Sequence, residues 1–457
     1  MDESTYRKIQ DIVGLEHCIR DREAMACYGY DASAAAGLPD VVAFPRNDRE
    51  VSALVILGGE AGFPITPRGS GTGTTGGCIA VRGGLVLATT RMNRILEIDT
   101  DNLVAHAQPG VMTGAFHAAV EAKGLYYPPD PASADYSTLG GNLGECAGGP
   151  RAVKYGVTRD YVLGLEAVIG TGELIRTGVK TAKGVVGYDL TRLLVGSEGT
   201  LGIITKIILR LLPRPEAVRT MVALYRDMGP AAETVSDIIR RGLIPRTIEF
   251  MDKASIRCVS DRINFSLPPE TGALLIIESD GTPDEAERVI RRLGEVCRER
   301  GALKAVIAGT RDEAEALWQA RKALSPAMYQ HGPDKMNEDI VVPRSRIPEM
   351  LRYIEALQAE TGLTMICFGH AGDGNIHFHI MLDKSVTGDL KRAREAVDKV
   401  FTKTLALGGS ISGEHGVGIS KKPYLSREIG GVEQRLMKQI KQAFDPRGIL
   451  NPGKIFP

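Results

Sequence analysis

The sequence predicts a mixed α+β protein built from at least two domains. Its 457 residues exceed one typical domain, and 43% of them are hydrophobic, an ordinary share for a globular chain with much to bury. Short apolar runs separated by glycine continue as far as Pro213 and Pro215, which break the pattern. Beyond them, strand-like and helix-like segments alternate, which is typical of a sheet covered by helices. We therefore place the first domain boundary at this proline pair.

The elements of the first domain follow from their boundary residues. Residues 46–62 are expected to form a helix, because Asn47 can cap its N-terminus and Glu50 stands three residues on, as in a capping box. The remaining elements are an extended piece at 64–67, strands at 85–88, 103–107, 162–169 and 202–212, and a helix at 113–123.

The second domain is expected to be a smaller α/β unit with helices on one face of its sheet. The periodicity of the sequence predicts strands at 220–225 and 274–278 and helices at 229–241, 283–299 and 311–330. The last helix is longer than usual and is expected to end near Gly332 and Pro333. The tail, D-P-R-G-I-L-N-P-G-K-I-F-P, is rich in turn formers, and we expect it to return to the first domain.

Charge and cysteine content exclude several classes of protein. Lys+Arg and Asp+Glu both number 56, so no net field draws the chain to nucleic acid or to a membrane. The seven cysteines are odd in number and scattered, which argues against a disulfide framework and against an iron–sulfur cluster. The start, MDESTYRKIQ, is too polar for a signal peptide, and no apolar run of 18 residues occurs. We expect a cytoplasmic protein without a transmembrane segment.

Histidines gather near the C-terminus, although the chain has only eight. The segments G-H-A-G-D-G-N-I-H-F-H and S-G-E-H-G supply His370, His377, His379, Glu414 and His415, with His331 a little upstream. Two imidazoles and a carboxylate suit a borderline divalent metal that keeps a position open for substrate. The alternative is a glycine-rich turn before a strand whose histidines are simply hydrogen-bonded polar groups. The presence of two clusters and a Glu-His pair favours the metal site.

A glycine-rich loop at 71–76, G-T-G-T-T-G, matches the dinucleotide pattern G-x-G-x-x-G, but its context differs. A Rossmann loop opens directly into a helix, whereas this loop leads into Gly76-Gly77 and a segment, 78–81, expected to be extended. Consecutive backbone N–H groups can still hold a phosphate in a nest, helped by nearby hydroxyls and by Arg68. A flexible surface loop is the alternative. The second unusual loop, 138–149, makes a paired cradle the better interpretation.

Six motifs occur in a fixed order along nearly the whole chain. They are P-R-G-S-G-T-G at 67–73, S-T-L-G-G-N at 137–142, G-S-E-G-T-L-G-I-I-T at 196–205, G-H-A-G-D-G-N-I-H at 369–377, G-E-H-G-V-G at 413–418 and D-P-x-G-I-L-N-P-G-K at 445–454. In this order they resemble the vanillyl-alcohol-oxidase/PCMH flavoprotein superfamily. Within it, they resemble the branch of glycolate oxidase large subunits, D-lactate dehydrogenases and D-2-hydroxyglutarate dehydrogenases.

The resemblance implies an α+β fold of three parts. A PCMH-type FAD-binding domain of two subdomains would cover residues 1–215, and an inserted α/β cap or substrate domain would cover 216–405. The C-terminal segment, 406–457, would return to complete the FAD domain and the active site.

The resemblance also implies which residues hold FAD. The pyrophosphate would lie against Pro67, Arg68, Gly69, Ser70, Gly71, Thr72 and Gly73. The flavin and ribityl chain would contact Pro131, Ser133, Thr138, Gly141, Asn142, Gly148 and Gly149. Glu198, Gly202 and Ile204 would lie near the adenine end, and Asn451 near the isoalloxazine ring. Some relatives attach FAD covalently through a histidine of the first loop. Residues 60–80 contain no histidine, so we expect dissociable FAD.

For catalysis, the resemblance implies metal ligation by His370, His377 and Glu414, with His415 as the general base. A 2-hydroxy acid can chelate the metal through its carboxylate and hydroxyl, and the metal lowers the pKa of the hydroxyl. An imidazole can take that proton near neutral pH, while hydride passes from Cα to flavin N5. Zn, Mn and Fe(II) all accept two histidines and a glutamate as ligands, so the sequence does not determine which metal is bound.

The cap domain carries residues of the types that bind the substrate carboxylate in relatives. These are Arg321, Ser325 and Lys335, although the spacing to the lysine is one residue shorter than in some relatives. An arginine fork suits a carboxylate, and the alternative is a solvated basic helix face. Some relatives carry other residues at the position of His379. His379 is therefore a candidate fourth metal ligand, a group that supports a ligand, or a substrate contact. Asn375 is a candidate to orient a ligand or touch the flavin.

Together these points predict an FAD- and metal-dependent dehydrogenase of a D-2-hydroxy acid, with D-lactate favoured over glycolate and D-2-hydroxyglutarate. Its electrons would pass to an external acceptor: electron-transfer flavoprotein, a quinone or a partner subunit. The sequence leaves the oligomeric state undetermined, and a homodimer is one possibility. Two alternatives belong to other classes, a flavin-dependent transferase like the alkylglycerone-phosphate synthases and a non-catalytic electron-relay subunit. The E-H-G motif and Arg321 argue against the first, and the complete set of histidines and Glu414 argues against the second.

Overall fold

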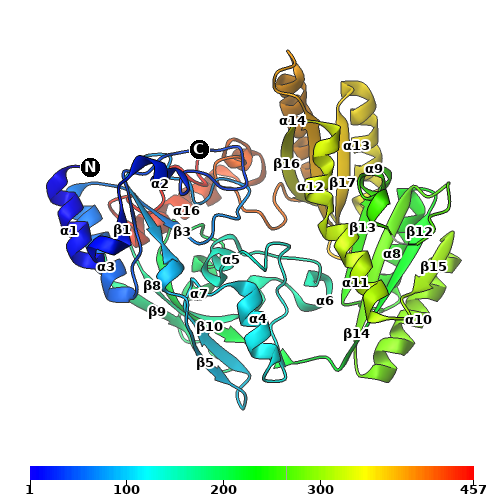
Figure 1. The fold of residues 1–457 in the computed structure, drawn as a ribbon, viewed down its shortest axis with the longest axis horizontal. Helices are drawn as coiled ribbons and strands as arrows, with labels where there is room; N and C mark the ends of the chain where they lie inside the picture. The colour runs from blue at the N-terminus through cyan, green and yellow to red at the C-terminus, as the bar shows by residue number, and fades with distance from the viewer. Residues whose placement is uncertain (264) are drawn as a thin grey trace. The chain divides into compact units, whose positions relative to one another are not determined.

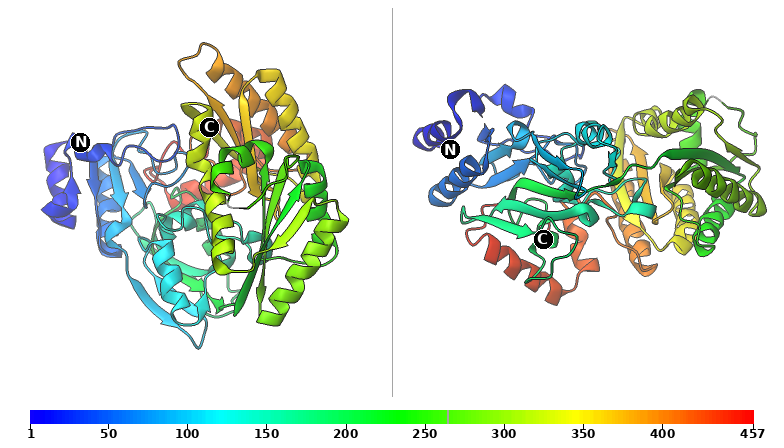
Figure 2. Two further views of the ribbon diagram at one scale, coloured as in Figure 1. Left: turned by 45° about the vertical axis from the view of Figure 1, so that its right-hand side comes forward. Right: turned by 90° about the horizontal axis from the view of Figure 1, so that it is seen from below.

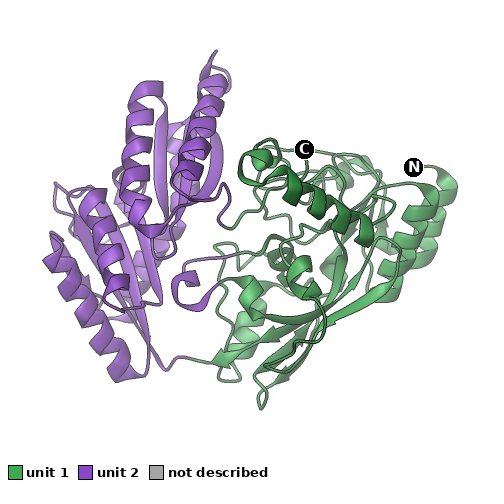
Figure 3. Cartoon of the chain, turned by 180° about the vertical axis from the view of Figure 1, so that it is seen from behind, with its two compact units in different colours: residues 1–147, 157–214, 414–457 green, residues 148–156, 215–413 purple. Residues whose placement is uncertain are grey.

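The computed structural model describes residues 1–263 and 265–457, and the path of the chain is shown in Figure 1. The chain forms two compact units, coloured separately in Figure 3. Unit 1 contains residues 1–147, 157–214 and 414–457, and unit 2 contains 148–156 and 215–413. Each unit is therefore assembled from segments that are distant in the sequence. The FAD-binding and cap roles of these parts of the chain are predictions.

Unit 1 is built on two main sheets. The first has the order β1-β2-β4-β3, in which β2, β4 and β3 run parallel, and the second has the antiparallel order β5-β6-β10-β8-β9. The strands are β1 (Cys18–Ile19), β2 (Val41–Ala43), β3 (Ile65–Arg68), β4 (Leu85–Ala88), β5 (Ile95–Asp99), β6 (Val104–Ala107), β8 (Val162–Val168), β9 (Leu174–Gly178) and β10 (Ile203–Arg210), with β7 (Leu125–Tyr126) and β11 (Leu212–Pro213) forming a small pair. The helices are α1 (Glu3–Val13), α2 (Arg22–Ala26), α3 (Asp48–Ala61), α4 (Thr113–Glu121), α5 (Leu139–Glu145), α7 (Leu190–Leu194), α15 (Leu425–Glu428) and α16 (Gly431–Phe444).

Most elements predicted for this region are confirmed, and one is wrong. Asn47 caps α3 as expected, accepting the Glu50 N–H at 2.9 Å. Residues 78–81 are not extended. The N–H of Ile79 bonds the Gly76 carbonyl at 3.2 Å and that of Val81 bonds the Ile79 carbonyl at 2.9 Å, so the segment satisfies its own backbone in turns rather than pairing with a strand.

The C-terminal tail lies against the edge of the four-stranded sheet. Ile65 of β3 donates its N–H to the Ile449 carbonyl at 2.8 Å, and Asn451 donates to the Ile65 carbonyl at 2.8 Å. Ile449 and Leu450 are buried in the same apolar cluster as Leu54 of α3. Backbone pairing and apolar burial together hold the tail in unit 1.

Unit 2 is built on one antiparallel sheet of seven strands in the order β15-β12-β14-β13-β17-β18-β16. The strands are β12 (Ala217–Tyr225), β13 (Thr247–Asp252), β14 (Ala273–Gly281), β15 (Lys304–Ile307), β16 (Asp334–Val341), β17 (Thr364–His370) and β18 (Asn375–Leu382). The helices are α6 (Ala152–Tyr155), α8 (Met228–Arg240), α9 (Lys253–Cys258), α10 (Pro283–Glu299), α11 (Arg311–Lys322), α12 (Leu324–Ala327), α13 (Ile347–Thr361) and α14 (Asp389–Ala406), of which α13 and α14 lie side by side in Figure 2.

Helices cover both faces of this sheet, so the expectation of one covered face is wrong. Val222 of β12 belongs to an apolar cluster with Leu317 of α11 and Leu324 of α12. Its neighbour Met221 points the other way, toward Gly294 of α10. Successive residues of a strand face opposite sides, so α10 and the α11–α12 pair must lie on different faces.

The long helix predicted at 311–330 is also wrong, because it divides in two. Helix α11 ends at Lys322, α12 spans Leu324–Ala327, and a 3₁₀ turn follows at Met328–His331. Pro326 explains the break, because its ring has no N–H to donate and clashes with the carbonyl four residues earlier. Arg321 therefore lies in the last turn of one helix, and Ser325 belongs to the next.

Within the described residues, we find no helix with the length and apolar character needed to cross a membrane.

Candidate active site

A cavity in unit 1 lies between the two glycine-rich loops and the start of β10. Among the predicted cofactor residues, it is lined by Pro67, Arg68, Gly69, Gly141, Glu198, Gly202 and Ile204. Several lining residues had not been predicted, including Gly77, Cys78, Gly144, Glu145, Ser197 and Gly199. The two loops and the G-S-E-G-T-L-G segment, far apart in the sequence, therefore share one cavity.

Glycine is required where the loops approach each other. A Cβ on Gly69 would lie 2.4 Å from the Thr138 hydroxyl oxygen, and one on Gly71 would lie 2.1 Å from an Arg68 guanidinium nitrogen. Gly71 also has a φ of +73°, a backbone conformation that residues with a side chain rarely adopt. Because these glycines have no side chain, the backbone of the two loops is accessible, which suits the binding of a phosphate group by main-chain N–H groups.

Two acidic side chains lie in this cavity, and Glu145 had escaped prediction. Glu198 accepts the N–H groups of Val417 and Gly418, both at 2.8 Å. One oxygen of Glu145 is buried and has no hydrogen-bond partner among residues 1–263 and 265–457. Burial, and after it the Glu198 carboxylate, raises the pKa of Glu145 well above its ordinary range. A buried carboxyl oxygen without a partner, on a group whose protonated form is favoured by burial, suits a hydrogen bond to a polar ligand such as FAD.

Three other predicted cofactor residues fix the walls of the cavity. Thr138 caps α5 by accepting the Gly141 N–H at 3.2 Å, and Asn142 donates to the Thr113 hydroxyl at 2.7 Å. Asn451 donates to the carbonyls of Gly77 at 2.8 Å and Glu198 at 2.7 Å, which ties the tail to the cavity. The remaining predicted residues do not line this cavity: Ser70, Gly71, Thr72, Gly73, Pro131 and Ser133 in unit 1, and Gly148 and Gly149 in unit 2.

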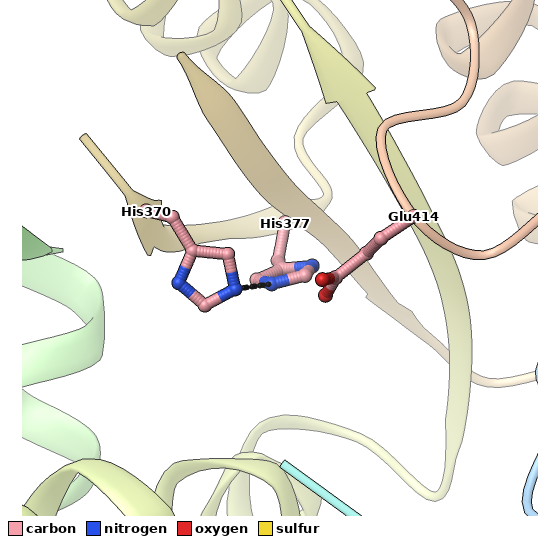
Figure 4. Close-up of side chains that lie close together, drawn as sticks. All are labelled: His370, His377 and Glu414. Atoms are coloured by element: carbon pink, nitrogen blue, oxygen red, sulfur yellow. Dashed lines mark hydrogen bonds between the residues drawn. The ribbon is translucent and has the colours of Figure 1, made fainter. Parts of the chain in front are cut away.

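The predicted metal ligands come together. His370 ends β17 and His377 lies on β18, and these strands are antiparallel neighbours joined by the turn 371–374. The Nε2 atoms of the two rings are 3.4 Å apart. Each of His370, His377 and Glu414 offers one ligand atom within 4.8 Å of the others, and Figure 4 shows the carboxylate directed toward the rings.

Local structure brings Glu414 to the histidines. The chain leaves unit 2 at Gly413, whose N–H donates to the buried Asp339 carboxylate at 2.7 Å. Asp339 is the direct partner of His377 in the pairing of β16 with β18. Because Glu414 follows Gly413, this bond places it next to the strand that carries His377.

The donor set fits a tetrahedral divalent metal. Zinc binds imidazole nitrogen at about 2.0–2.1 Å, so tetrahedral geometry separates two such ligands by roughly 3.3–3.4 Å. The two Nε2 atoms lie 3.4 Å apart. Two histidines and a carboxylate also leave a fourth position for a substrate or water, as catalytic zinc sites do.

The predicted substrate residues lie in two groups. Arg321 donates to Glu249 through Nε at 2.9 Å and Nη2 at 2.8 Å, and its guanidinium lies 4.3 Å from the centre of the Phe368 ring. Lys335 donates instead to the Ser325 hydroxyl at 3.0 Å, and burial lowers the pKa of Lys335. The hydrogen bonds thus join two of the three predicted residues and link the third to Glu249.

His415 and the two residues left open lie as follows. The Nε2 of His415 is 3.9 Å from the Glu414 carboxylate, and its carbonyl accepts the Thr75 hydroxyl at 3.1 Å. His379 stacks on Phe368, with ring centroids 4.9 Å apart. Asn375 donates to the Ile340 carbonyl at 3.1 Å, so its amide supports the strand pair beneath the turn.

Comparison with protein families matches most of the chain. The family described as "FAD linked oxidases, C-terminal domain" matches residues 214–455, and the "FAD binding domain" matches residues 39–178. "Glycolate oxidase subunit GlcD" of Bacillus subtilis (strain 168) is 47% identical over 94% of this chain and 92% of its own length. "D-lactate dehydrogenase" of Anaerostipes hadrus is 38% identical over 95% of this chain and 91% of its own length.

Solved structures share the fold at low identity. A p-cresol methylhydroxylase with substrate bound has a TM-score of 0.81 and 17% identity, covering 99% of this chain and 96% of its own. An alkyldihydroxyacetonephosphate synthase has a TM-score of 0.78 and 20% identity, covering 99% and 86%. At these identities the similarity concerns the fold alone, and it confirms the predicted PCMH-type α+β architecture.

Proposed function

Because this chain belongs to the FAD-linked oxidases of the GlcD and D-lactate dehydrogenase type, we propose that it oxidises a D-2-hydroxy acid to the 2-oxo acid with FAD and a divalent metal. D-Lactate is the favoured substrate. The observation that carries the proposal is the convergence of His370, His377 and Glu414, a donor set that suits a metal able to chelate a 2-hydroxy acid.

The two bound groups supply chemistry that no side chain has: FAD accepts two electrons as hydride, and a divalent metal acts as a Lewis acid on the hydroxyl. The chain holds the metal through His370, His377 and Glu414. His415, adjacent to Glu414, accepts the hydroxyl proton on its imidazole. Arg321 receives the substrate carboxylate, for which its planar fork is suited, and Ser325 with Lys335 adds a second polar group.

FAD is held without a covalent bond in this proposal. The loop from Pro67 to Gly73, of which Pro67, Arg68 and Gly69 line the cavity, receives the pyrophosphate on its backbone, and the Glu145 carboxyl forms a hydrogen bond to the cofactor. The predicted contacts from Pro131, Ser133, Gly148, Gly149 and Asn451 belong to the same proposal.

Glycolate is a second candidate substrate, because a relative with 47% identity is named as a glycolate oxidase subunit. Glycolate also carries the carboxylate and hydroxyl that a metal can chelate, and it lacks only the methyl group of lactate. The word "subunit" in that name supports a partner polypeptide as the electron acceptor, ahead of electron-transfer flavoprotein or a quinone.

The substrate panel that tests the proposal uses the purified flavoprotein under anaerobic conditions. D-Lactate, L-lactate, glycolate and D-2-hydroxyglutarate are added in turn, and the flavin absorbance near the visible maximum is followed. We expect full bleaching by one D-acid or by glycolate and none by L-lactate. A flavin that no hydroxy acid bleaches would contradict the proposal and favour the transferase or the electron-relay alternative.

A further inference from the structure

One buried carboxylate, Glu249, contacts both a metal ligand and a predicted substrate residue. It lies on β13, directly opposite His370 of β17 in the antiparallel pairing of the two strands. Its side chain is 1% exposed. Oε1 accepts a hydrogen bond from His370 Nδ1, while Oε2 accepts Arg321 Nε at 2.9 Å and Nη2 at 2.8 Å. The two oxygens therefore serve two different partners.

The bond to His370 decides which ring nitrogen faces the metal position. A carboxylate can only accept, so Nδ1 must carry the hydrogen, and the lone pair of a neutral imidazole then lies on Nε2. Nε2 is the atom that faces His377 at 3.4 Å. Carboxylates in this position orient metal-bound histidines in many proteins and raise their basicity as ligands.

The bond to Arg321 fixes the guanidinium in one plane. Glu249 engages Nε and Nη2, and the Phe368 ring lies 4.3 Å from the guanidinium carbon. Among the described residues, Nη1 makes no hydrogen bond, so one edge of the fork is left for another acceptor. Arg321 is thereby oriented before any substrate arrives.

Fold stability alone does not account for a carboxylate here. A buried ion pair is often no more stable than apolar side chains of the same volume, because both charges lose their water. The nearest residues on the same face of this strand and of its neighbour, Met251 and Phe368, belong to an apolar cluster. The carboxylate is therefore explained by its two polar partners, His370 and Arg321, rather than by the packing of the strand.

We propose that Glu249 is a positioning residue that couples the metal centre to the substrate-binding arginine, with one oxygen for His370 and the other for Arg321. This inference rests on the proposed function, since it assumes a metal at His370 and a carboxylate substrate at Arg321. It assigns to one side chain the relative orientation of the two groups that hold a 2-hydroxy acid.

The test measures Zn²⁺ affinity of the full-length flavoprotein by competition with a chromophoric chelator, which requires no turnover. Glu249→Ala should raise the Kd for Zn²⁺ by about 10–100-fold, the range found for lost supporting carboxylates. Glu249→Gln keeps an oxygen for Nδ1 but turns an amide N–H₂ toward Arg321. It should hold the Kd within about threefold while raising KM for the hydroxy acid at least about tenfold.

Glu278→Gln is the matched control. Glu278 is a buried carboxylate on the adjacent strand β14, bonded to Trp318 at 2.6 Å and Thr220 at 3.0 Å and paired with Arg246, but it contacts no metal ligand. It should leave the Zn²⁺ Kd unchanged within about threefold. The proposal is overturned if Glu249→Ala binds Zn²⁺ like the wild type, or if Glu278→Gln weakens Zn²⁺ as much as Glu249→Ala does. An unchanged KM in Glu249→Gln would equally overturn the proposal. If Glu249→Ala does not fold, the KM of Glu249→Gln alone decides the test.

Failure of the proposed function would be seen separately, in the wild type. A wild-type protein that no hydroxy acid reduces, or that binds no divalent metal, contradicts the proposed function before any variant is compared. A wild type that is reduced and binds Zn²⁺, with Glu249 variants unaltered, contradicts only the role of Glu249.

Discussion

Gly374 lies in the turn between His370 and His377, the two histidines of the proposed metal site, and replacing it with alanine tests how that turn sets their separation. Its φ is +95°, and a Cβ there would lie 2.0 Å from the Val342 carbonyl oxygen, closer than any real contact. Val342 is held in place by its own N–H, which donates to the Gly374 carbonyl at 3.0 Å. The backbone would have to shift by about 1 Å to bring the contact to 3.0 Å.

The expected cost follows from two terms. A left-handed backbone costs an alanine about 1–2 kcal/mol, and forced overpacking adds about 1–3 kcal/mol, which together give about 2–5 kcal/mol. Gly362, at the end of α13, is the matched control: its φ is +71° and nothing lies within 4 Å of the added Cβ. Gly362→Ala should therefore cost only the first term, about 1–2 kcal/mol.

Denaturant unfolding of the wild type and both variants measures these costs in stability. Competition with a chromophoric chelator measures their affinity for Zn²⁺. Metal sites tolerate ligand distances within only about 0.2 Å, so a shift of about 1 Å should weaken Zn²⁺ binding at least tenfold in Gly374→Ala and not in Gly362→Ala. Equal destabilisation of the two variants would refute the steric argument. Unchanged Zn²⁺ affinity in a folded Gly374→Ala would refute the link between the turn and the metal ligands.

Three further predictions concern the base, the cofactor and the pH dependence. His415→Ala should retain FAD and Zn²⁺ but lose flavin reduction by substrate; full reduction at the wild-type rate would remove His415 from the mechanism. Acid precipitation should release all FAD into the supernatant, and flavin that stays with the polypeptide would contradict non-covalent binding. Burial raises the pKa of Asp252 from 3.8 to about 6, so the stability that its protonated form contributes is complete below pH 3.8 and is lost as pH rises through about 6. Asp252→Asn should flatten the pH dependence of Tm between these values, and an identical slope in both proteins would contradict the assignment.

The proximity of His370 and His377, two of the predicted metal ligands, could be predicted from the sequence because it is local. His370 and His377 flank one glycine-rich turn, and a turn between antiparallel strands brings its flanking residues together. Glu249 lies 121 positions before His370, and only the pairing of β13 with β17 makes them neighbours. No short sequence motif predicts the pairing register of two strands that lie so far apart in the chain.

Other departures have physical causes that the sequence shows only in part. Pro326 was a visible signal for the helix break, yet the apolar periodicity around it suggested a continuous helix. Glu145 is the last residue of helix α5, in a segment rich in glycine. The return of the C-terminal segment brings Gly416 beside it, where an added Cβ would lie 2.2 Å from a Glu145 carboxylate oxygen. Burial that depends on segments so far apart cannot be inferred from local pattern.

The most direct test of the metal-dependent mechanism compares flavin reduction in metal-depleted and metal-restored protein. The protein is treated with a chelator, freed of it, and mixed anaerobically with D-lactate or glycolate, whichever reduces the untreated flavoprotein, before and after addition of Zn²⁺ or Mn²⁺. Depletion is expected to abolish the rapid bleaching while FAD stays bound, and added metal is expected to restore the bleaching. Reduction at an unchanged rate in protein shown to contain no metal would contradict the role assigned to His370, His377 and Glu414.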